Sequence, residues 1–487
     1  MQVLNLKTIS KTIGSLLMLE ATLMTGCLAV ALYYRGTDIV PFILSIIIAT
    51  AAGFGFRMMG RDADNLLSRR DAYFVVTISW VIFSLIGSLP FLIGSYITNF
   101  TDAFFEAISG FTTTGATIID DVERLPHGLL FWRSLTQWIG GLGIVFFTIA
   151  LLPSMVGGSV RVFAAEATGP IRSKLHPRLS TGAKWIWLVY VLLTVTCMFC
   201  YMACGMNWFN AINYAMTSTA TGGFATTNGS IATFHSPAEE YVCTLFCFLA
   251  GVNFTLLWFS VAKLRIRDLF RNAEFRFYIM MIVVATTFIM VELMARNHYD
   301  LEHAFRSSIF QVVSFVTSTG LFSDDAARWP HVTWIVLAVL MVIGGCSGST
   351  SGGIKSIRGV MLLKIVRNEF RQILHPNAVL PMKINGANVT QGKRVTLLAF
   401  VTLYIILAGC CAFAMTAAGI DHTNAITITL SCLGNVGPTL GLEIGPTMSW
   451  SILPDMAKWA CAFLMLVGRL ELFTVLVIFT PAFWKEG

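Results

Sequence analysis

Long apolar segments recur along this 487-residue sequence and constrain its fold more than any other feature. A helix that crosses the hydrocarbon core of a bilayer needs about 20 apolar residues. The segments that meet this need are residues 12–34, 38–58, 73–97, 128–152, 184–205, 239–262, 276–296, 331–362, 394–419 and 455–481. With 56% hydrophobic and only 12% charged residues, the chain is too apolar for a water-soluble fold. We therefore predict an all-α polytopic membrane protein, with one bilayer crossing for each segment.

Basic residues alternate between the loops that join these segments. Most of the 33 Lys and Arg residues lie near the two termini or in every second loop, which are residues 57–70, 161–184, 263–276 and 355–394. The positive-inside rule places these loops and both termini in the cytoplasm. The net charge of +7 follows from this topology and gives no support for nucleic-acid binding.

The 11 cysteines do not indicate a disulfide framework, because their number is odd and nearly all lie inside apolar segments. Cys197, Cys200 and Cys204 have a spacing that resembles a metal site, but small core residues are the better interpretation. We predict no cofactor bound to this chain.

A short element rich in threonine and glycine occurs four times. Its copies are TTTGAT (112–117), STATGGF (218–224), FVTSTGLF (315–322) and, more diverged, CLGNVGPT (432–439). The aligned glycines are Gly115, Gly222, Gly320 and Gly437. Each copy follows an apolar segment and a short helical segment, and each precedes another apolar segment. Packing of small residues between helices could explain one copy, but four copies in register indicate four repeats of one unit.

The short helical segments begin near four good N-cap residues, Asp102, Asn207, Asp300 and Asp421. Each segment is too short to cross the bilayer, so we interpret it as a re-entrant half-helix that stops near mid-membrane. Four half-helices around one axis would direct their negative C-terminal ends at a common centre, which favours a cation. Glycine then lets the following backbone present carbonyl oxygens to the ion.

The predicted architecture is therefore four pseudo-repeated units around one central pore. Each unit consists of a first span, a pore half-helix and a second span, and two extra transmembrane helices in residues 1–70 precede the first unit. The four units are residues 71–160, 180–270, 275–370 and 392–487.

These two-span units, with the filter sequences TTTGA, TATGG, TSTGL and GNVGP, resemble the Trk/Ktr/HKT superfamily of potassium transporters. The two extra spans and the total length are similar to those of a bacterial TrkH-type subunit of the inner membrane. In that family a serine in place of the first filter glycine is associated with sodium transport, so Gly115 implies potassium selectivity. The fourth filter departs from the others, with Asn435 and Val436 before its glycine. The resemblance implies potassium binding at Thr112, Thr113, Thr114, Gly115, Ala220, Thr221, Gly222, Ser318, Thr319, Gly320, Asn435, Val436 and Gly437.

A glycine-rich stretch, GGCSGSTSGGIKS (344–356), interrupts the second span of unit three. Each glycine costs roughly 1 kcal/mol relative to alanine inside a helix, so we predict a break near mid-bilayer. The stretch resembles the intramembrane gating loop of TrkH and KtrB proteins, whereas the alternative is a kink filled by neighbouring helices. Lys355 could hold this loop by binding carbonyl groups or an acid, and the alternative is that it belongs to the cytoplasmic basic cluster. The predicted gate residues are Gly344, Gly345, Ser347, Gly348, Ser349, Thr350, Ser351, Gly352, Gly353 and Lys355.

Arg469 lies inside the last apolar segment, where a charge is rare and usually faces a cavity or a partner. Glu471 is two positions away and does not share its helix face. We predict that Arg469 faces the pore below the filter as a barrier to cations, in agreement with the resemblance. The alternative is an ion pair between Arg469 and a carboxylate on another span.

The resemblance also implies partners, namely a second copy of the chain in a homodimer and a cytosolic ring of TrkA-type subunits that bind nucleotides. Passive, channel-like conduction is favoured over proton- or sodium-coupled symport, because no buried chain of carboxylates or histidines suggests a proton relay.

Two enzymatic interpretations are weak. Gly345-Cys346-Ser347-Gly348 looks like an intramembrane serine protease motif, but all eight histidines lie in loops or at span ends, out of reach as a base. The stretch GSTSGGIKS only approximates a nucleotide-binding P-loop, because Ile354 separates the required glycine and lysine and no strand precedes it. We therefore predict that the protein is not an enzyme.

Overall fold

The computed structural model describes residues 4–63, 67–143, 179–262, 265–441 and 448–485. Its described part is helical apart from one two-stranded antiparallel hairpin, β1 (Lys383–Ile384) and β2 (Ala387–Asn388). The end of predicted unit one after Gly143 lies outside the described residues, as does most of the basic loop that follows it, with Arg161, Arg172, Lys174 and Arg178.

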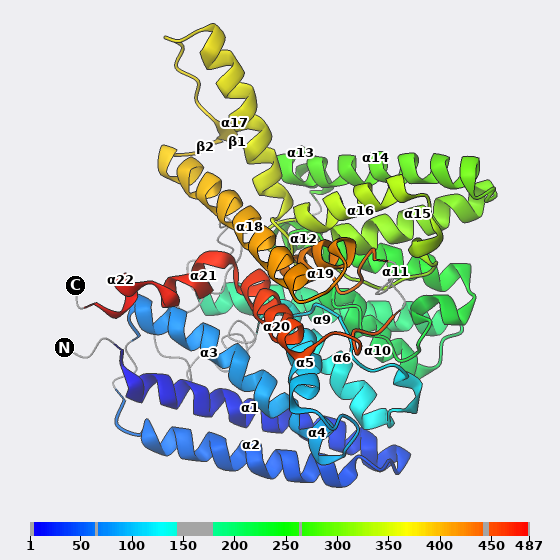
Figure 1. Ribbon diagram of the computed structural model, residues 1–487, viewed down its shortest axis with the longest axis vertical. Helices are drawn as coiled ribbons and strands as arrows, with labels where there is room; N and C mark the ends of the chain where they lie inside the picture. Colours follow the sequence, from blue (N-terminus) through cyan, green and yellow to red (C-terminus); the bar gives the residue numbers. More distant parts are fainter. Residues whose placement is uncertain (1–3, 64–66, 144–178, 263–264, 442–447, 486–487) are drawn as a thin grey trace.

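The helices follow the chain order of Figure 1. The first half comprises α1 (Leu6–Tyr34), α2 (Ile39–Met59), α3 (Arg69–Gly87), α4 (Leu89–Ile93), α5 (Phe100–Phe111), α6 (His127–Leu142), α9 (Leu179–Ala203), α10 (Trp208–Ala220), α11 (Pro237–Ala250) and α12 (Phe254–Ala262). The second half comprises α13 (Ile266–Arg271), α14 (Ala273–Arg296), α15 (Leu301–Val316), α16 (His331–Ile343), α17 (Ser356–Leu374), α18 (Gln391–Ala417), α19 (His422–Gly434), α20 (Asp455–Leu470), α21 (Leu472–Leu476) and α22 (Pro481–Trp484). Short 3₁₀ helices are η1 (Val122–Arg124), η2 (Ser230–Phe234), η3 (Ala326–Arg328) and η4 (Val477–Phe479).

The long apolar helices agree with the predicted spans at six places in the described chain, namely α1, α2, α3 with α4, α9, α14 and α18. Two further spans are bent pairs, which the sequence did not predict: α11 and α12 meet at 100°, and α20 and α21 meet at 115°. Asn253 accepts a hydrogen bond from the Leu256 N–H and so starts a new helix after Gly251. Glu471, at a φ of 64°, ends α20.

The remaining two predicted spans have different outcomes. Span 331–362 is divided at Gly344 into α16 and α17, as the glycine-rich stretch predicted. Span 128–152 begins as α6 and continues outside the described residues.

The four half-helices α5, α10, α15 and α19 form a closed ring with their neighbours. Each packs between the two helices that flank it in sequence, for example α5 between α3 and α6. The helix that follows each half-helix also packs on the half-helix of the next unit, so α6 contacts α10, α11 contacts α15 and α16 contacts α19. The ring closes because α20, the last long helix, packs on α5 of the first unit.

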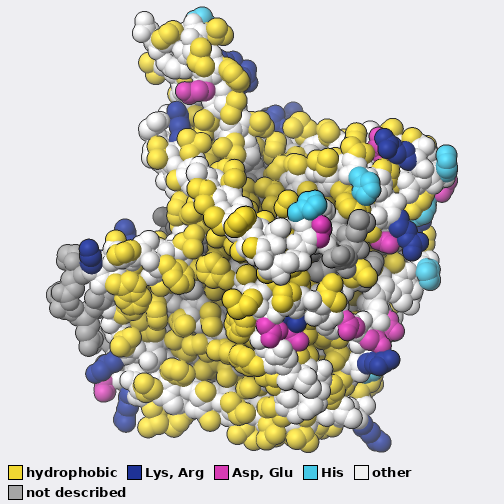
Figure 2. Space-filling model, viewed as in Figure 1, with side chains coloured by type: hydrophobic (Ala, Val, Ile, Leu, Met, Phe, Trp, Pro, Cys, Tyr) yellow, Lys and Arg dark blue, Asp and Glu magenta, His cyan; other side chains and the backbone are white. Residues whose placement is uncertain are grey.

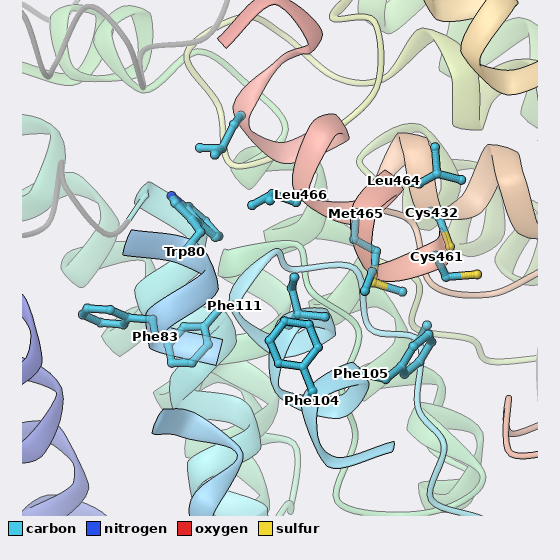
Figure 3. Close-up of a cluster of buried hydrophobic side chains, with 14 of the residues drawn as sticks. Trp80, Phe83, Phe104, Phe105, Phe111, Cys432, Cys461, Leu464, Met465 and Leu466 are labelled. Carbon is cyan, nitrogen blue, oxygen red and sulfur yellow. The ribbon is translucent and has the colours of Figure 1, made fainter. Parts of the chain in front are cut away.

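Aromatic side chains support the contact that closes this ring. Phe104, Phe105 and Phe111 of α5 lie between α3, which contributes Trp80 and Phe83, and α20 (Figure 3). The Phe83 and Phe111 rings meet edge to face with centroids 5.5 Å apart. This arrangement is favourable for aromatic pairs and fixes the position of the first half-helix.

The outside of the molecule is apolar, as a bilayer requires. Hydrophobic side chains cover most of the visible face in Figure 2, and exposed residues such as Ile47, Val284 and Ile405 are 58–64% accessible. The C-terminal part of α17 projects away from the other helices (Figure 1), whereas the β-hairpin packs beside the start of α17 and the start of α18. Unlike the spans, α17 is amphipathic and carries Lys364, Arg367 and Arg371.

Candidate ion pathway

The half-helices begin at side-chain caps that the sequence largely predicted. Asn207, Asp300 and Asp421 each accept a hydrogen bond from a backbone N–H of the first turn, at 2.8, 3.4 and 2.9 Å. In unit one the cap is Asn99, which accepts from the Thr101 N–H at 3.0 Å. Asp102, the predicted start, instead lies in the first turn and pairs with Lys458 of α20 at 2.6 Å. The first half-helix therefore begins three residues before its predicted start, and Asp102 takes part in the contact with α20 instead.

Each half-helix is followed by the same unusual backbone. One residue enters the left-handed region at a φ of 52–55°, and a glycine two positions later has a φ of 77–94°. The left-handed residues are Thr113, Thr221, Ser318 and Asn435. The glycines are Gly115, Gly223, Gly320 and Gly437, and their positive φ favours a residue without a side chain.

This pattern corrects the predicted register of unit two, where Gly223 rather than Gly222 is equivalent to Gly115. The hydrogen bonds agree, because the Gly222 N–H bonds the Thr217 carbonyl at 2.9 Å as the Thr114 N–H bonds the Ser109 carbonyl at 2.9 Å. Gly222 therefore occupies the position of Thr114. Two adjacent glycines made the sequence alignment ambiguous by one residue, and only backbone geometry distinguishes them.

The four filter segments touch one another in a ring. A Cβ atom added to Gly115 would collide with the carbonyl of Gly222, and one added to Gly223 would collide with that of Thr319. The same relation joins the remaining filter glycines to the carbonyls of Val436 and Thr114. Each filter glycine thus lies against the residue that precedes the filter glycine of the next unit, and the fourth closes on the first.

The threonine hydroxyls of units one and three bond within their own segments. Thr112 and Thr114 share a hydrogen bond of 2.8 Å between their Oγ1 atoms, and Thr317 and Thr319 share one of 2.7 Å. Thr112 also donates to the Ile108 carbonyl at 2.6 Å. These hydroxyls are buried and satisfy the last turn of each half-helix, so they support the filter backbone.

In units two and four other side chains take over this supporting function. Gln137 of α6 donates to the Gly222 carbonyl at 2.6 Å and accepts from the Phe224 N–H at 3.0 Å. Asn435 donates to Thr114 Oγ1 at 3.0 Å and to the Met465 carbonyl at 2.9 Å. The diverged residue of the fourth filter therefore makes a structural contact, because the Asn435 amide joins unit four to unit one and to α20. No pattern in the sequence pointed to Gln137.

All four filter glycines line one cavity of about 100 Å³. Its wall is completed by the segments that leave the filter, including Thr117, Phe224 and Phe322, and by Trp450. Ions that approach along this cavity would meet the filter glycines directly.

The glycine-rich loop between α16 and α17 lies directly against the filter segments. Thr350 Oγ1 reaches the carbonyls of Thr219, at 3.1 Å, and Ala250, at 3.2 Å. The Gly352 N–H donates to Ser318 Oγ at 2.6 Å. A Cβ atom on Gly352 would collide with the Gly434 carbonyl of unit four. The loop thus contacts units two, three and four at the C-terminal ends of their half-helices.

Polar side chains hold both ends of this loop. Glu274 Oε1 accepts hydrogen bonds from the N–H groups of Ser347, at 2.5 Å, and Ile357, at 3.2 Å. Lys355 Nζ donates to the Ser351 carbonyl at 2.5 Å, which is one of the alternatives the sequence left open. The loop is therefore an ordered segment whose shape depends on a few buried contacts.

Arg469 bridges this loop to the first unit. Its Nη1 donates to the Thr350 carbonyl at 2.7 Å, and its Nη2 donates to the carbonyls of Gly140, at 2.6 Å, and Gly141, at 2.5 Å. The guanidinium thus joins the C-terminal end of α6 to the loop, at the level just beyond the filter.

Glu471 pairs with a different arginine. Arg358 Nη2 lies 2.7 Å from Glu471 Oε2, and the Arg358 guanidinium also lies 3.9 Å from the Phe400 ring centroid. This pair joins the first turn of α17, just after the loop, to the bend between α20 and α21. The two breaks below the filter are therefore linked by one ion pair, which the sequence did not predict.

Comparisons with known proteins agree on one family, and together they cover nearly the whole chain. A family model described as TrkH, cation transport protein, matches residues 38–486. The Trk system potassium uptake proteins TrkH of Halomonas elongata and of Escherichia coli K12 are 35% and 34% identical, and each comparison covers 99% of this chain and 100% of the relative. The crystal structure of the potassium transporter TrkH from Vibrio parahaemolyticus matches with a TM-score of 0.90 and 32% identity, over 99% of this chain and 100% of that one.

Replacing Arg469 with alanine should increase cation flux. A unit charge about 4 Å from an ion changes the energy of the ion by about 1 to 4 kcal/mol, so we expect a rise of roughly tenfold. Rb⁺ uptake into proteoliposomes that contain equal amounts of folded protein would measure it. Arg469→Lys is the matched control, because it keeps the charge and should keep the flux low. Equal flux in wild type and Arg469→Ala would place the barrier elsewhere.

Proposed function

This chain belongs to the TrkH family of cation transport proteins, and we propose on that premise that it is the potassium-conducting membrane subunit of a potassium uptake system. The observation that carries the proposal is the closed ring of four filter segments, each with one glycine at positive φ. Such a ring places four half-helix C-termini around one point, and their negative dipole ends favour a cation there.

We propose that the filter backbone replaces the water shell of potassium. The carbonyls that end each segment lie beside a glycine of the neighbouring unit, so four chain segments can coordinate one ion together. The potassium-binding segments are residues 112–115, 220–223, 317–320 and 434–437. The hydroxyls of the threonine pairs in units one and three and the amide nitrogen of Asn435 bond within the protein, which supports coordination by backbone oxygens.

The loop of residues 344–356 is the proposed gate. It contacts three of the four units immediately below the filter, and Arg469 connects it to the remaining unit. A glycine-rich segment can change its backbone shape at low steric cost, so the loop can block an aqueous path in one arrangement and clear it in another.

The proposed location is the bacterial inner membrane, with both termini in the cytoplasm. The relatives are named as components of a Trk system, which supports partner subunits. We propose a cytosolic TrkA-type ring that binds nucleotides and acts on the gate.

A homodimer is the proposed assembly. Helix α17 projects from the body and exposes an apolar stripe in which Leu363, Val366, Phe370 and Ile373 are 51–70% accessible. Their spacing of three and four residues is that of a helix-pairing seam, and a second copy offers the matching seam.

Channel-like conduction is favoured over coupled symport. A proton-coupled mechanism needs a carboxylate that can load and release a proton along the path. Two buried carboxylates beside the filter and the gate, Glu106 and Glu274, are held by an arginine and by backbone N–H groups respectively. These fixed partners keep both side chains in one arrangement.

Purified protein in a planar bilayer should carry a current whose reversal potential follows the potassium gradient. We expect a change of about 59 mV for each tenfold change in K⁺, the value for one charge per ion. The same recording, with pH and Na⁺ gradients varied at fixed K⁺, tests coupling. A reversal potential that moves with either gradient would indicate symport and overturn the channel interpretation.

Gly223→Ser should reduce potassium selectivity. The residue has a φ of 84°, and a side chain there would collide with the Thr319 carbonyl. The left-handed conformation alone costs about 1 to 2 kcal/mol, so we expect the K⁺/Na⁺ permeability ratio to fall by roughly tenfold. Gly26→Ser is the control, because a Cβ atom at Gly26 meets nothing within 4 Å. An unchanged ratio in Gly223→Ser would remove Gly223 from the filter.

Shortening the loop from Ser347 to Gly352 should raise Rb⁺ uptake and make it less dependent on the regulatory partner and its ligand. Thr350→Val is a milder variant, since it removes only the hydroxyl contacts with Thr219 and Ala250. Thr287→Val serves as the control, because that exposed hydroxyl donates to the Val283 carbonyl within its own helix, α14. If flux and regulation are unaltered in both test variants, the loop is a helix break without a gating role.

A further inference from the structure

A buried ion pair lies behind the first filter segment. Arg133 of α6 and Glu106 of α5 meet at 2.8 Å, and their side chains are only 2% and 0% accessible. The Glu106 carboxylate also accepts hydrogen bonds from Thr117 Oγ1 and from the Ile118 N–H, each at 3.0 Å. Thr117 is the second residue after Gly115, so the pair holds the backbone that leaves the filter of unit one.

The same arginine reaches into the second unit. Arg133 Nη1 donates to the Ala225 carbonyl at 3.0 Å, and Nη2 donates to Thr117 Oγ1 at 3.2 Å. Its guanidinium carbon lies 4.1 Å from the centroid of the Phe224 ring. One planar guanidinium thus connects the segments that leave two adjacent filters.

Helix α6 makes a second contact one turn further along. Gln137, four residues after Arg133, bonds the Gly222 carbonyl and the Phe224 N–H from the same helix face. Three backbone groups of the unit-two segment, at Gly222, Phe224 and Ala225, are therefore bonded by two side chains of unit one.

Uncharged residues at the positions equivalent to Glu106 make similar hydrogen bonds in units two and three. The residue nine positions before the filter glycine is Tyr214 in unit two and Gln311 in unit three. The Tyr214 hydroxyl bonds Thr227 Oγ1 at 2.8 Å, and Gln311 donates to the Asp324 carbonyl at 3.0 Å. Both partners lie four residues after the filter glycine of their own unit. Unit four has Ile428, which has no polar group. Among these four equivalent positions, only the one in unit one, Glu106, carries a charge. It is also the only one of the four that is linked to another unit through an arginine.

A buried ion pair is a poor source of stability, because the cost of removing two charges from water offsets their attraction. A guanidinium holds several hydrogen-bond donors in one plane and so fixes the directions of its partners. A pair of apolar side chains could not fix these directions. We propose that Glu106 and Arg133 are positioning residues for ion selection, which set the relative placement of the first and second filter segments. The inference rests on the proposed potassium-conducting function. It states that one ion pair sets the spacing between the first and second filter segments.

Arg133→Lys is the decisive variant, because it keeps the buried positive charge and loses the planar fork. One ammonium nitrogen cannot occupy the three positions from which Nε, Nη1 and Nη2 of Arg133 reach Glu106, Ala225 and Thr117. We expect the K⁺/Na⁺ permeability ratio, from bi-ionic reversal potentials of the full-length protein in a bilayer, to fall by roughly tenfold. That change corresponds to the loss of about one hydrogen bond to a charged group.

Thr117→Val provides a second test that leaves both charges in place. It removes the hydroxyl that Glu106 and Arg133 share, so the permeability ratio should fall in the same direction. Arg306→Lys is the matched control. Arg306 also forms a partly buried pair, with Glu240 at 2.7 Å, and the contacts of its guanidinium are with Glu240 and Glu302. This control should keep the wild-type ratio.

The outcomes separate the inference from the proposed function. Wild-type protein without a potassium-selective current would contradict the function itself. A selective wild type with unchanged ratios in Arg133→Lys and Thr117→Val would overturn the positioning function, even if conductance falls. If Arg133→Lys does not yield folded protein, as judged by thermal unfolding, the permeability ratio of Thr117→Val decides alone. A reduced ratio at an unchanged unfolding temperature supports the inference.

Discussion

The structure depends on one constraint, which is that irregular backbone inside a membrane must find hydrogen-bond partners within the protein. Four half-helices end in the interior, and each leaves terminal carbonyl groups without helical partners. The i to i+5 bonds after each helix, such as Thr114 N–H to Ser109 carbonyl, satisfy part of this need. Threonine hydroxyls supply further partners within units one and three, and side chains that cross between units supply others, so the filter segments depend on their closed ring.

The four units meet this constraint with different residues. Threonine hydroxyls act in units one and three, whereas Gln137 and Asn435 act in units two and four. The side chains of Gln137 and Asn435 both cross from one unit to another. Sequence divergence among the repeats therefore does not weaken the ring, because the diverged residues supply the contacts between units.

Below the filter, the gate loop and the bend of the last span form one connected region. Arg469 joins the loop to α6, and the Arg358–Glu471 pair joins the start of α17 to the bend after α20. Because α17 projects from the body, a force on it would act on the loop through its first turn. This connection would link the proposed cytosolic partner to the proposed ion path.

The sequence alone determined the all-α membrane fold, the four half-helices and the break at Gly344. These features follow from the length of the apolar segments, the basic loops and the repeated glycine element, because they depend on local hydrophobicity and on the free-energy cost of glycine in a helix. Tertiary structure decided what depends on neighbours. It selected Asn99 over Asp102 as a cap and Gly223 over Gly222 as a filter glycine, and it bent two spans that read as continuous. It also paired Arg133 with Glu106 and Arg358 with Glu471, since residues 27 and 113 positions apart leave no local pattern from which their contact could be predicted.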